Sequence, residues 1–255
     1  MDLAALCAVA ALAGFVDAIV GGGGLIQLPA LLLTLPQHSI PTLFGTNKMS
    51  SICGTAVATA QYAQRLPIRW HSILPAAFTA FVFSGLGAWA IRMFADANPT
   101  ALKSIVLLLL VAVGLHTAFR KELGEIHQPR WAARRERLAG LLLGAVIGFY
   151  DGFFGPGTGS FLLFAFVGLF GFDFLNATAS AKVLNLATNL AAVLYFGATG
   201  NILWAYALPM GACNVAGSLL GTRLAMWKGN RFIRALFLIV ITALLARLAW
   251  EMFAP

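Results

Sequence analysis

The chain contains an internal repeat at a shift of 134 positions. That shift aligns GFVDAIVGGGG (14–24) with GFYDGFFGPGT (148–158). It continues without a gap and pairs Lys48 with Lys182, two rare charges within apolar sequence. Self-similarity at one fixed shift is the signature of a repeated structural unit. We therefore predict that the protein is a duplicated half.

The duplication defines the expected domain organisation. Repeat one spans 1–119, repeat two spans 138–255, and a basic linker at 120–137 joins them. No polar block is long enough to form a separate soluble domain, so residues 1–255 are predicted to form a single membrane domain.

The composition is typical of a protein that lies in a bilayer. Hydrophobic residues make up 60% of the chain, charged residues 10%, and the mean hydropathy is +0.86, which is outside the range of soluble domains. The net charge of +8 comes from basic residues that cluster between apolar segments, where they set membrane orientation, so we expect no nucleic-acid partner. The three cysteines stand singly in apolar sequence, which argues against a disulfide framework or a metal cluster.

Each repeat has five apolar segments, of which the second is short. They lie at 3–20, 25–35, 45–63, 72–94 and 101–119 in repeat one, and at 137–154, 159–171, 177–198, 202–226 and 232–253 in repeat two. At about 1.5 Å per helical residue, the short segments cover about half of a roughly 30 Å hydrocarbon core. We predict an all-α integral membrane fold in which each repeat has a glycine-interrupted broken helix or re-entrant hairpin plus three transmembrane helices.

The basic residues predict the orientation. Six of them lie in the linker at 120–137, which is therefore cytoplasmic by the positive-inside rule. The basic loop at 228–234 belongs on the same side, which requires an even number of crossings between the two. That parity holds if the glycine-interrupted region counts as two passes or as a hairpin that returns to its own side. The repeats are then inverted relative to each other, with both termini outside.

Inverted repeats with breaks at matching places are the architecture in which secondary transporters bind substrate near the bilayer midplane. A turn between two half-helices leaves amides unpaired at about 23–26 and 157–161. Such amides, at the positive end of a helix dipole, form an anion site. The candidate substrate-binding residues at the breaks are Gly21, Gly22, Gly23, Gly24 and Gln27 in repeat one, and Gly155, Gly157, Thr158, Gly159 and Ser160 in repeat two.

Each repeat also carries an aspartate and a lysine within apolar sequence, Asp17 with Lys48 and Asp151 with Lys182. A charge within a membrane helix costs at least about 2.5 kcal/mol on insertion scales, so it ordinarily faces a cavity or a partner. In one hypothesis the lysines attract an anion, and the aspartates balance them or titrate. In the other, Asp17–Lys48 and Asp151–Lys182 are ion pairs that hold helices together without touching substrate.

Three asparagines accompany the lysines. Asn47, Asn185 and Asn189 lie beside a lysine or one to two turns after it. They are candidates for lining the substrate path, although hydrogen bonding between helices is the commoner role of asparagine in membranes. The four histidines have no repeat partner, so no metal site is expected.

Taken together, these motifs resemble the sulfite exporter TauE/SafE family of bacterial membrane proteins. The likeness rests on GFVDAIVGGGGLIQLPALL, GTNKMSS, GFYDGFFGPGTGSFL and ATASAKVLNLATN, in order and spacing over nearly the whole chain. It implies a transporter of small anions in the bacterial inner (cytoplasmic) membrane, with sulfite and organosulfonates as the associated substrates. Repeat one has Gln27 where repeat two has Phe161, so the repeats are not expected to contribute equally.

Other classes of function fit less well. The stretch GPGTGSFL lacks the glycine after Ser160 that an intramembrane serine protease needs, and the sequence has no phosphate-loop GK[ST], so we expect neither an enzyme nor a cofactor. A passive anion channel is the serious alternative, because half-helices in inverted repeats serve channels too. We predict a secondary-active transporter of sulfite, an organosulfonate or a related sulfur-containing or organic acid. It would work by alternating access with protons as candidate coupling ions, and its oligomeric state stays open.

Overall fold

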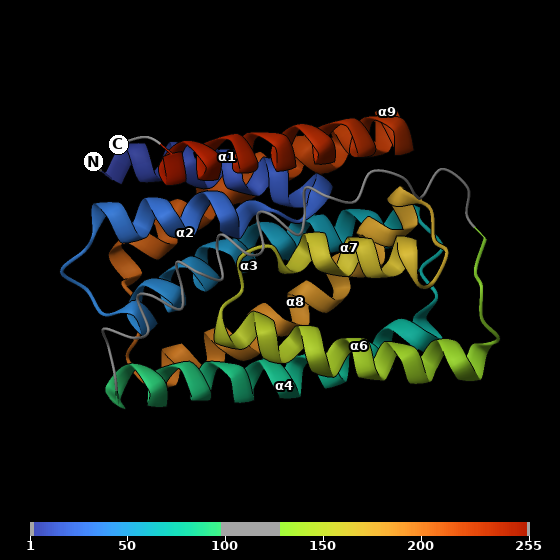
Figure 1. Ribbon diagram of the computed structural model, residues 1–255, viewed down its shortest axis with the longest axis horizontal. Coiled ribbons are helices and arrows are strands. Elements are labelled where there is room, and N and C mark those ends of the chain that lie inside the picture. Colours follow the sequence, from blue (N-terminus) through green and yellow to red (C-terminus); the bar gives the residue numbers. More distant parts are fainter. Residues whose placement is uncertain (1–2, 98–127, 254–255) are drawn as a thin grey trace.

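The computed structural model describes residues 3–97 and 128–253, and within these ranges every regular element is a helix (Figure 1). The helices are α1 (Leu3–Val20), α2 (Gly23–Thr34), α3 (Ile40–Arg65), α4 (Trp70–Ala97), α6 (Ala133–Phe153), α7 (Thr158–Gly168), α8 (Phe174–Ala198) and α9 (Trp204–Phe253). The predicted all-α class is confirmed. The predicted segment at 101–119 lies outside the described residues.

Six of these helices fall into three kinds by length and hydropathy. By length and composition alone, the helical stretches Leu3–Val20, Trp70–Ala95 and Phe174–Ala198 can each cross a membrane. The shorter apolar helices α2 and α7 occupy the positions where the sequence predicts half-helices. The longer helix α3 is more polar, because it carries buried lysine, asparagine and hydroxyl side chains into the centre of the protein.

Equivalent helices begin at equivalent positions in the two repeats. Ser39 caps the first turn of α3 by accepting a hydrogen bond from the Thr42 amide, and Asp173, at the same place in repeat two, does so for α8 from the Asn176 amide. Such side-chain caps satisfy amides that the helix itself leaves unpaired. The local signals that start these helices were therefore duplicated along with the apolar segments.

The chain reverses direction at both glycine breaks. Helices α1 and α2 form a hairpin from one end of the bundle, and α6 and α7 form a second hairpin from the opposite end (Figure 1). The tips of the two hairpins meet. The Ser160 amide donates to the Gly21 carbonyl at 3.2 Å, and Ser160 Oγ donates to the Val20 carbonyl at 2.9 Å. Of the two predicted alternatives for these segments, the structure has the hairpin.

Glycines allow the helices of different repeats to approach closely. On α6 a glycine occupies every fourth position and lies against the backbone or small side chains of α4, at Gly140, Gly144, Gly148 and Gly152. A Cβ added at Gly148 would lie only 2.5 Å from the carbonyl oxygen of Ala80. Small residues at this spacing are a common interface between membrane helices.

The same packing occurs on the other side of the molecule. Gly14 of α1 packs on Asn214 of α9, and the shift of 134 turns this pair into Gly148 and Ala80. Helix α1 therefore packs on α9 as α6 packs on α4. Each hairpin lies against a long helix of the other repeat, so the repeats interlock.

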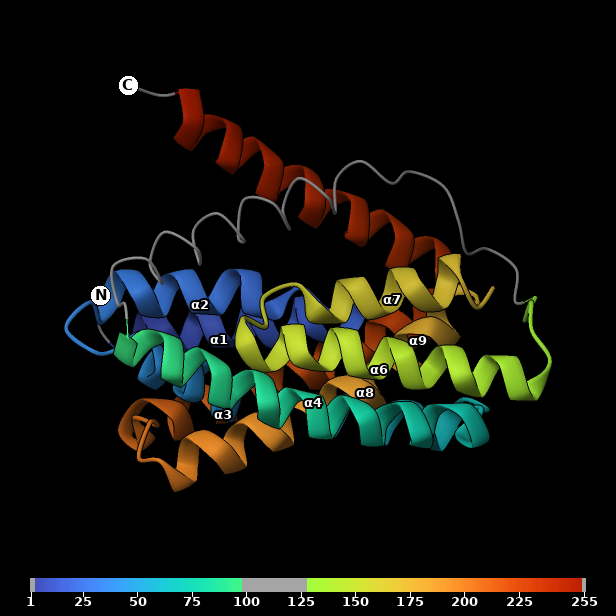
Figure 2. The ribbon, with the colours of Figure 1, turned by 60° about the horizontal axis from the view of Figure 1, so that its bottom comes forward.

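Helix α9 consists of two helical segments that meet at Gly229. This residue has φ 69° and ψ −161°, which is not helical. The sequence separates two apolar segments here, at 202–226 and 232–253, and that predicted break is confirmed. Beyond Gly229, α9 turns away from the rest of the bundle (Figure 2).

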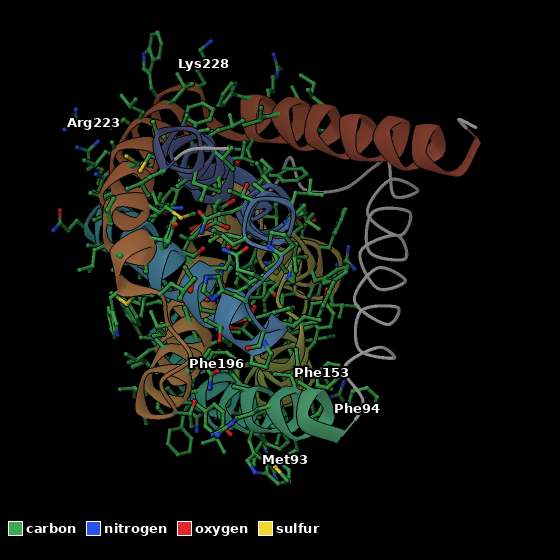
Figure 3. The ribbon with its side chains drawn as sticks, turned by 90° about the vertical axis from the view of Figure 1, so that its left-hand side faces the viewer. Met93, Phe94, Phe153, Phe196, Arg223 and Lys228 are labelled. Atoms are coloured by element: carbon green, nitrogen blue, oxygen red, sulfur yellow. The ribbon has the colours of Figure 1, made fainter. Side chains whose placement is uncertain are left out.

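Aromatic side chains from three helices belong to one hydrophobic cluster. Phe94, Phe153 and Phe196 come from α4, α6 and α8, and Figure 3 labels them in the lower part of the view. Met93 points outward there. It continues an exposed apolar face along α4 that includes Leu74, Phe78, Val82, Leu86 and Trp89. A continuous apolar face of this kind suits contact with lipid.

We expect Gly148→Ala to lower the stability of the fold by about 1–3 kcal/mol, because the added methyl group overlaps the α4 backbone. Gly85→Ala on α4 is the matched control, since a Cβ there has nothing within 4 Å, and alanine favours a helix over glycine. Thermal unfolding of the purified variants in detergent measures the stability of both Gly148→Ala and Gly85→Ala. Equal midpoints for Gly148→Ala and the wild type would show that the α4–α6 contact is not needed.

Candidate functional site

A polar cavity lies where the two hairpin tips meet α3 and α8. Its volume is about 30 Å³, which is room for about two water molecules. The cavity is lined by Asp17, Gly21, Gly24, Asn47, Lys48, Ser51, Asp151, Gly155, Gly157, Thr158, Gly159, Asn185 and Asn189. All of these except Ser51 are candidate residues from the sequence. Ser51 was missed because it stands in an ordinary helical stretch and carries no charge.

Two ion pairs lie at the cavity. Lys48 Nζ of α3 is 2.6 Å from Asp151 Oδ2 of α6, and Lys182 Nζ of α8 is 2.7 Å from Asp17 Oδ2 of α1. The aspartates and lysines therefore pair, but the predicted partners within each repeat are wrong. Each lysine pairs with the aspartate of the other repeat, because the interlocked hairpins carry each aspartate across the centre of the molecule.

The two ion pairs have different surroundings. Asp17 also accepts a hydrogen bond from Thr55 Oγ1 at 3.4 Å, and its partner Lys182 is not among the residues that line the cavity. Lys48 does line the cavity. Its contact with Asp151 Oδ2 is short, but that oxygen has no well-angled hydrogen bond to any residue in the described part of the chain. Asp151 thus has fewer supporting hydrogen bonds than Asp17, and in this sense the Lys48–Asp151 pair is less braced than the Lys182–Asp17 pair.

Asn47 brings a further polar group to the cavity. Its side-chain oxygen is buried and has no hydrogen-bond partner within residues 3–97 and 128–253. A buried polar atom without a partner costs free energy, so Asn47 is expected to bond to whatever fills the cavity. Asn185 and Asn189 line the cavity from α8.

More of the backbone amides at the glycine turns are hydrogen-bonded than the sequence predicts. The interpretation that the amides of 23–26 and 157–161 are unpaired is wrong for four of them. These amides donate to carbonyls, Leu25 to Gly22, Thr158 to Gly155, Ser160 to Gly21 and Phe161 to Gly157. The tight turns bring their own carbonyls within reach, and the opposite tip supplies the carbonyl of Gly21. Charged and amide side chains therefore provide more of the site's chemistry than the bare backbone does.

Five candidate residues from the sequence do not line the cavity, namely Gly22, Gly23, Gln27, Ser160 and Lys182. Gln27 is fully buried. It donates to the Asn47 carbonyl at 3.4 Å and accepts from Asn214 Nδ2 at 3.2 Å. Together with Ser160 at the meeting of the tips, it positions the residues that do line the cavity. Asn214 was missed because its counterpart in repeat one is an alanine.

Two glycines at the tips are required by close approach. Gly21 has φ +77°, and a Cβ there would lie 2.5 Å from the Cα of Gly159. Gly155 has φ +91°, and a Cβ there would lie 3.0 Å from Lys48 Nζ. Only glycine adopts such angles without strain. The glycines thus allow the tips to touch and Lys48 to reach Asp151.

The cavity is lined by two carboxylates together with ammonium, amide and hydroxyl groups. Among the residues that the structure describes, no group of three or more His, Cys, Asp or Glu side chains is arranged to hold a metal ion. Cys7, Cys53 and Cys213 are free thiols. Beside Asp17 and Asp151, the ammonium group of Lys48 and the amide and hydroxyl groups of the lining are donors that can bind anionic oxygens by charge-assisted hydrogen bonds.

The chain matches the family model described as "Sulfite exporter TauE/SafE" over residues 6–248. It is 40% identical to "Probable membrane transporter protein ORF9" of a Sinorhizobium species, over 96% of this chain and 92% of that protein. It is 36% identical to a "Probable membrane transporter protein" of Haemophilus influenzae, over 98% of this chain and 95% of that protein. For "Probable membrane transporter protein YfcA" of Escherichia coli K12, the identity is 35% over 98% of this chain and 90% of that protein.

No solved structure matches the chain. The family match covers the glycine hairpins, both ion pairs and the cavity between them. This multi-pass helical membrane protein belongs to the sulfite exporter TauE/SafE family.

Proposed function

We propose that the protein is a secondary-active transporter that moves a small anion by alternating access. Its family and the names of its relatives support transport across a membrane. The observation that carries the proposal is the buried polar cavity between two hairpin tips, where Lys48 and Lys182 each pair with an aspartate of the other repeat. A site at the interface of two repeats is one that a carrier can expose to either side in turn.

The proposal includes two inverted repeats within a single membrane domain. Three observations support it: the ungapped shift of 134, the reciprocal packing of α1 on α9 and α6 on α4, and the entry of the hairpins from opposite ends (Figure 1). In this mechanism one hairpin and its partner helix rock against the other pair. The tips stay in contact and act as the pivot.

The proposed orientation has the linker in the cytoplasm and both termini outside, in the bacterial inner membrane. The start of α6, the end of α3 and the bend of α9 all lie at the right-hand end of the bundle in Figure 1. Basic residues gather near these points, including Arg65, Arg134, Arg135, Lys228 and Arg231. The start of α1 and the end of α9 lie at the left-hand end. The positive-inside rule supports a cytoplasmic right-hand end.

The proposed substrate is sulfite, an organosulfonate or a related small sulfur-containing or organic acid. Lys48 supplies a positive charge, and Ser51, Asn185 and Asn189 supply hydroxyl and amide groups around a small cavity. A compact anion with several acceptor oxygens satisfies these groups together. The family description, sulfite exporter, supports the same class of substrate.

The purified protein, reconstituted in proteoliposomes, tests the proposal directly. Flux is measured for sulfite, sulfate, thiosulfate, sulfoacetate and acetate, with and without a pH gradient, and protein-free liposomes are the control. We expect saturable flux of at least one sulfur oxyanion and faster flux with a pH gradient. If none of the five anions moves, the proposed substrate class is wrong. Conductance near the diffusion limit without any response to pH would favour a passive anion channel.

A further inference from the structure

We infer that the anion crosses together with as many protons as it has negative charges, so that transport is electroneutral, and that the first proton binds Asp151. The inference rests on the proposed transport function and adds its stoichiometry and its proton site. Three features of the cavity support it: the sum of its fixed charges, the unequal bracing of its ion pairs and the exposure of Lys48 to the cavity.

The fixed charges at the cavity sum to zero. They are those of Lys48, Lys182, Asp17 and Asp151, whose side chains are at most 15% exposed. An unbalanced charge buried inside a membrane protein is strongly unfavourable. A bound monoanion would leave one negative charge in excess, and one proton on a carboxylate removes it. A dianion requires two protons, which is also the number that the two aspartates can accept.

The geometry makes Asp151 the first carboxylate to take a proton. Asp17 is held by Lys182 at 2.7 Å and by Thr55 Oγ1 at 3.4 Å, so protonation there would weaken two contacts. Asp151 Oδ2 lies beside Lys48 but has no well-angled hydrogen bond among the described residues. Protonation of Asp151 therefore costs less bonding than protonation of Asp17.

The same protonation would create the anion site. With its charge neutralised, Asp151 no longer holds Lys48, whose ammonium group lines the cavity. An anion then replaces the carboxylate as the partner of Lys48. The side-chain oxygen of Asn47, buried without a partner in the described part of the chain, accepts a hydrogen bond from a protonated oxyanion or from a water bound with it.

The groups around Asp151 offer no second buried cation to replace Lys48. On its own helix, the Tyr150 hydroxyl is occupied, since it donates to the Pro156 carbonyl at 2.6 Å. The titratable side chains described on α4 are His71 and Arg92, near the two ends of that helix, and α7 has none. The remaining charged groups at the site are Lys48 from α3, Asp17 from α1 and Lys182 from α8, and Lys182 is already paired with Asp17.

Tight coupling follows from the charges of the intermediate states. The empty site is neutral with both ion pairs formed, and the site with anion and matching protons is neutral too. A site with the anion alone or the proton alone carries a net buried charge. Conformational change is therefore favoured only for the empty and the fully loaded site, and the anion and its protons move in the same direction.

The full-length protein in proteoliposomes tests the inference with sulfite as the first probe, followed by any other anion of the panel that moves. A potassium gradient with valinomycin sets the membrane potential, and the pH gradient is set separately. We expect no effect of potential on flux. At equilibrium, each pH unit should accumulate a monoanion about tenfold and a dianion about a hundredfold. Flux that follows the membrane potential would overturn electroneutrality and leave the proposed transport function standing.

Asp151→Asn and Asp17→Asn are matched variants, because the shift of 134 relates the two positions. Asp151→Asn should lose the response to a pH gradient but still exchange anion for anion, since its amide cannot hold a coupling proton. Asp17→Asn alone would leave Lys182 without its counter-charge, so the variant to compare is the charge-neutral double variant Asp17→Asn with Lys182→Met. It keeps the sum of fixed charges at zero and should keep a response to the pH gradient. Loss of the pH response in the double variant, with retention in Asp151→Asn, would overturn the assignment to Asp151. Failure of every anion to move would overturn the proposed function as well.

Discussion

Lys48→Met should reduce the initial rate of anion uptake by at least about a hundredfold, because the variant loses the charged donor that the bound anion contacts. Removal of Lys48 also breaks a buried ion pair and should lower stability as removal of Lys182 does, but the protein should still fold, since methionine is similar in length and a lone Asp151 can be neutralised by a proton. Uptake by proteoliposomes measures the rate. Size-exclusion chromatography and the thermal midpoint report the fold. Uptake at the wild-type rate would remove Lys48 from the site.

Lys182→Met is the matched control for Lys48→Met. Lys182 is in the better braced ion pair and does not line the cavity. Its removal should therefore act mainly on stability, and removal of one partner of a buried ion pair costs about 3–5 kcal/mol. The swapped pair Asp17→Lys with Lys182→Asp should recover part of that loss. Equal losses of rate in the two folded lysine variants would contradict the division of roles between the pairs.

Gly21→Ala should prevent the hairpin tips from meeting and leave little folded protein. The residue has φ +77°, and the added Cβ would lie 2.5 Å from the Cα of Gly159, where neither backbone can move without separating the tips. Strain in the left-handed region alone costs about 1–2 kcal/mol. Overlap with a fixed backbone adds to this cost. The yield of monodisperse protein and its thermal midpoint measure the effect.

Gly200→Ala separates the effect of backbone strain at positive φ from the effect of overlap with a neighbouring backbone. Gly200 has φ +71° but nothing within 4 Å of an added Cβ, so its substitution introduces only the backbone strain. We expect a folded protein with a moderately lower midpoint. If Gly21→Ala is as stable as Gly200→Ala, close contact between the tips is not a requirement of the fold.

The segments of the fold were predictable because they depend on local properties. The apolar segment at 3–20 matches α1 (Leu3–Val20), and the short segments at 25–35 and 159–171 match α2 (Gly23–Thr34) and α7 (Thr158–Gly168) within a few residues. Prediction was weaker at α3, which begins at Ile40 and not near 45. There the cap at Ser39 sets the start, and hydropathy does not reveal a cap.

The candidate site was predictable to a similar degree and for a similar reason. Glycines and charges that recur at one shift stand out against apolar sequence, and most of them line the cavity. Ser51 and Asn214 have no such signal. Gln27 and Ser160 are polar and close to the turns, yet their hydrogen bonds are directed into the protein. Proximity along the chain does not determine the direction of a side chain.

The sequence by itself determined that this is a duplicated, helical membrane protein with glycine turns and two acid and lysine sets, because hydropathy, helix length and the shift of 134 are properties of the chain. Only the tertiary structure decided which aspartate pairs with which lysine. Asp17 and Lys48 have the same spacing as Asp151 and Lys182, so spacing alone permits pairing within a repeat or between repeats. Interlocking of the hairpins selects pairing between repeats, because it carries each aspartate to the third helix of the other half.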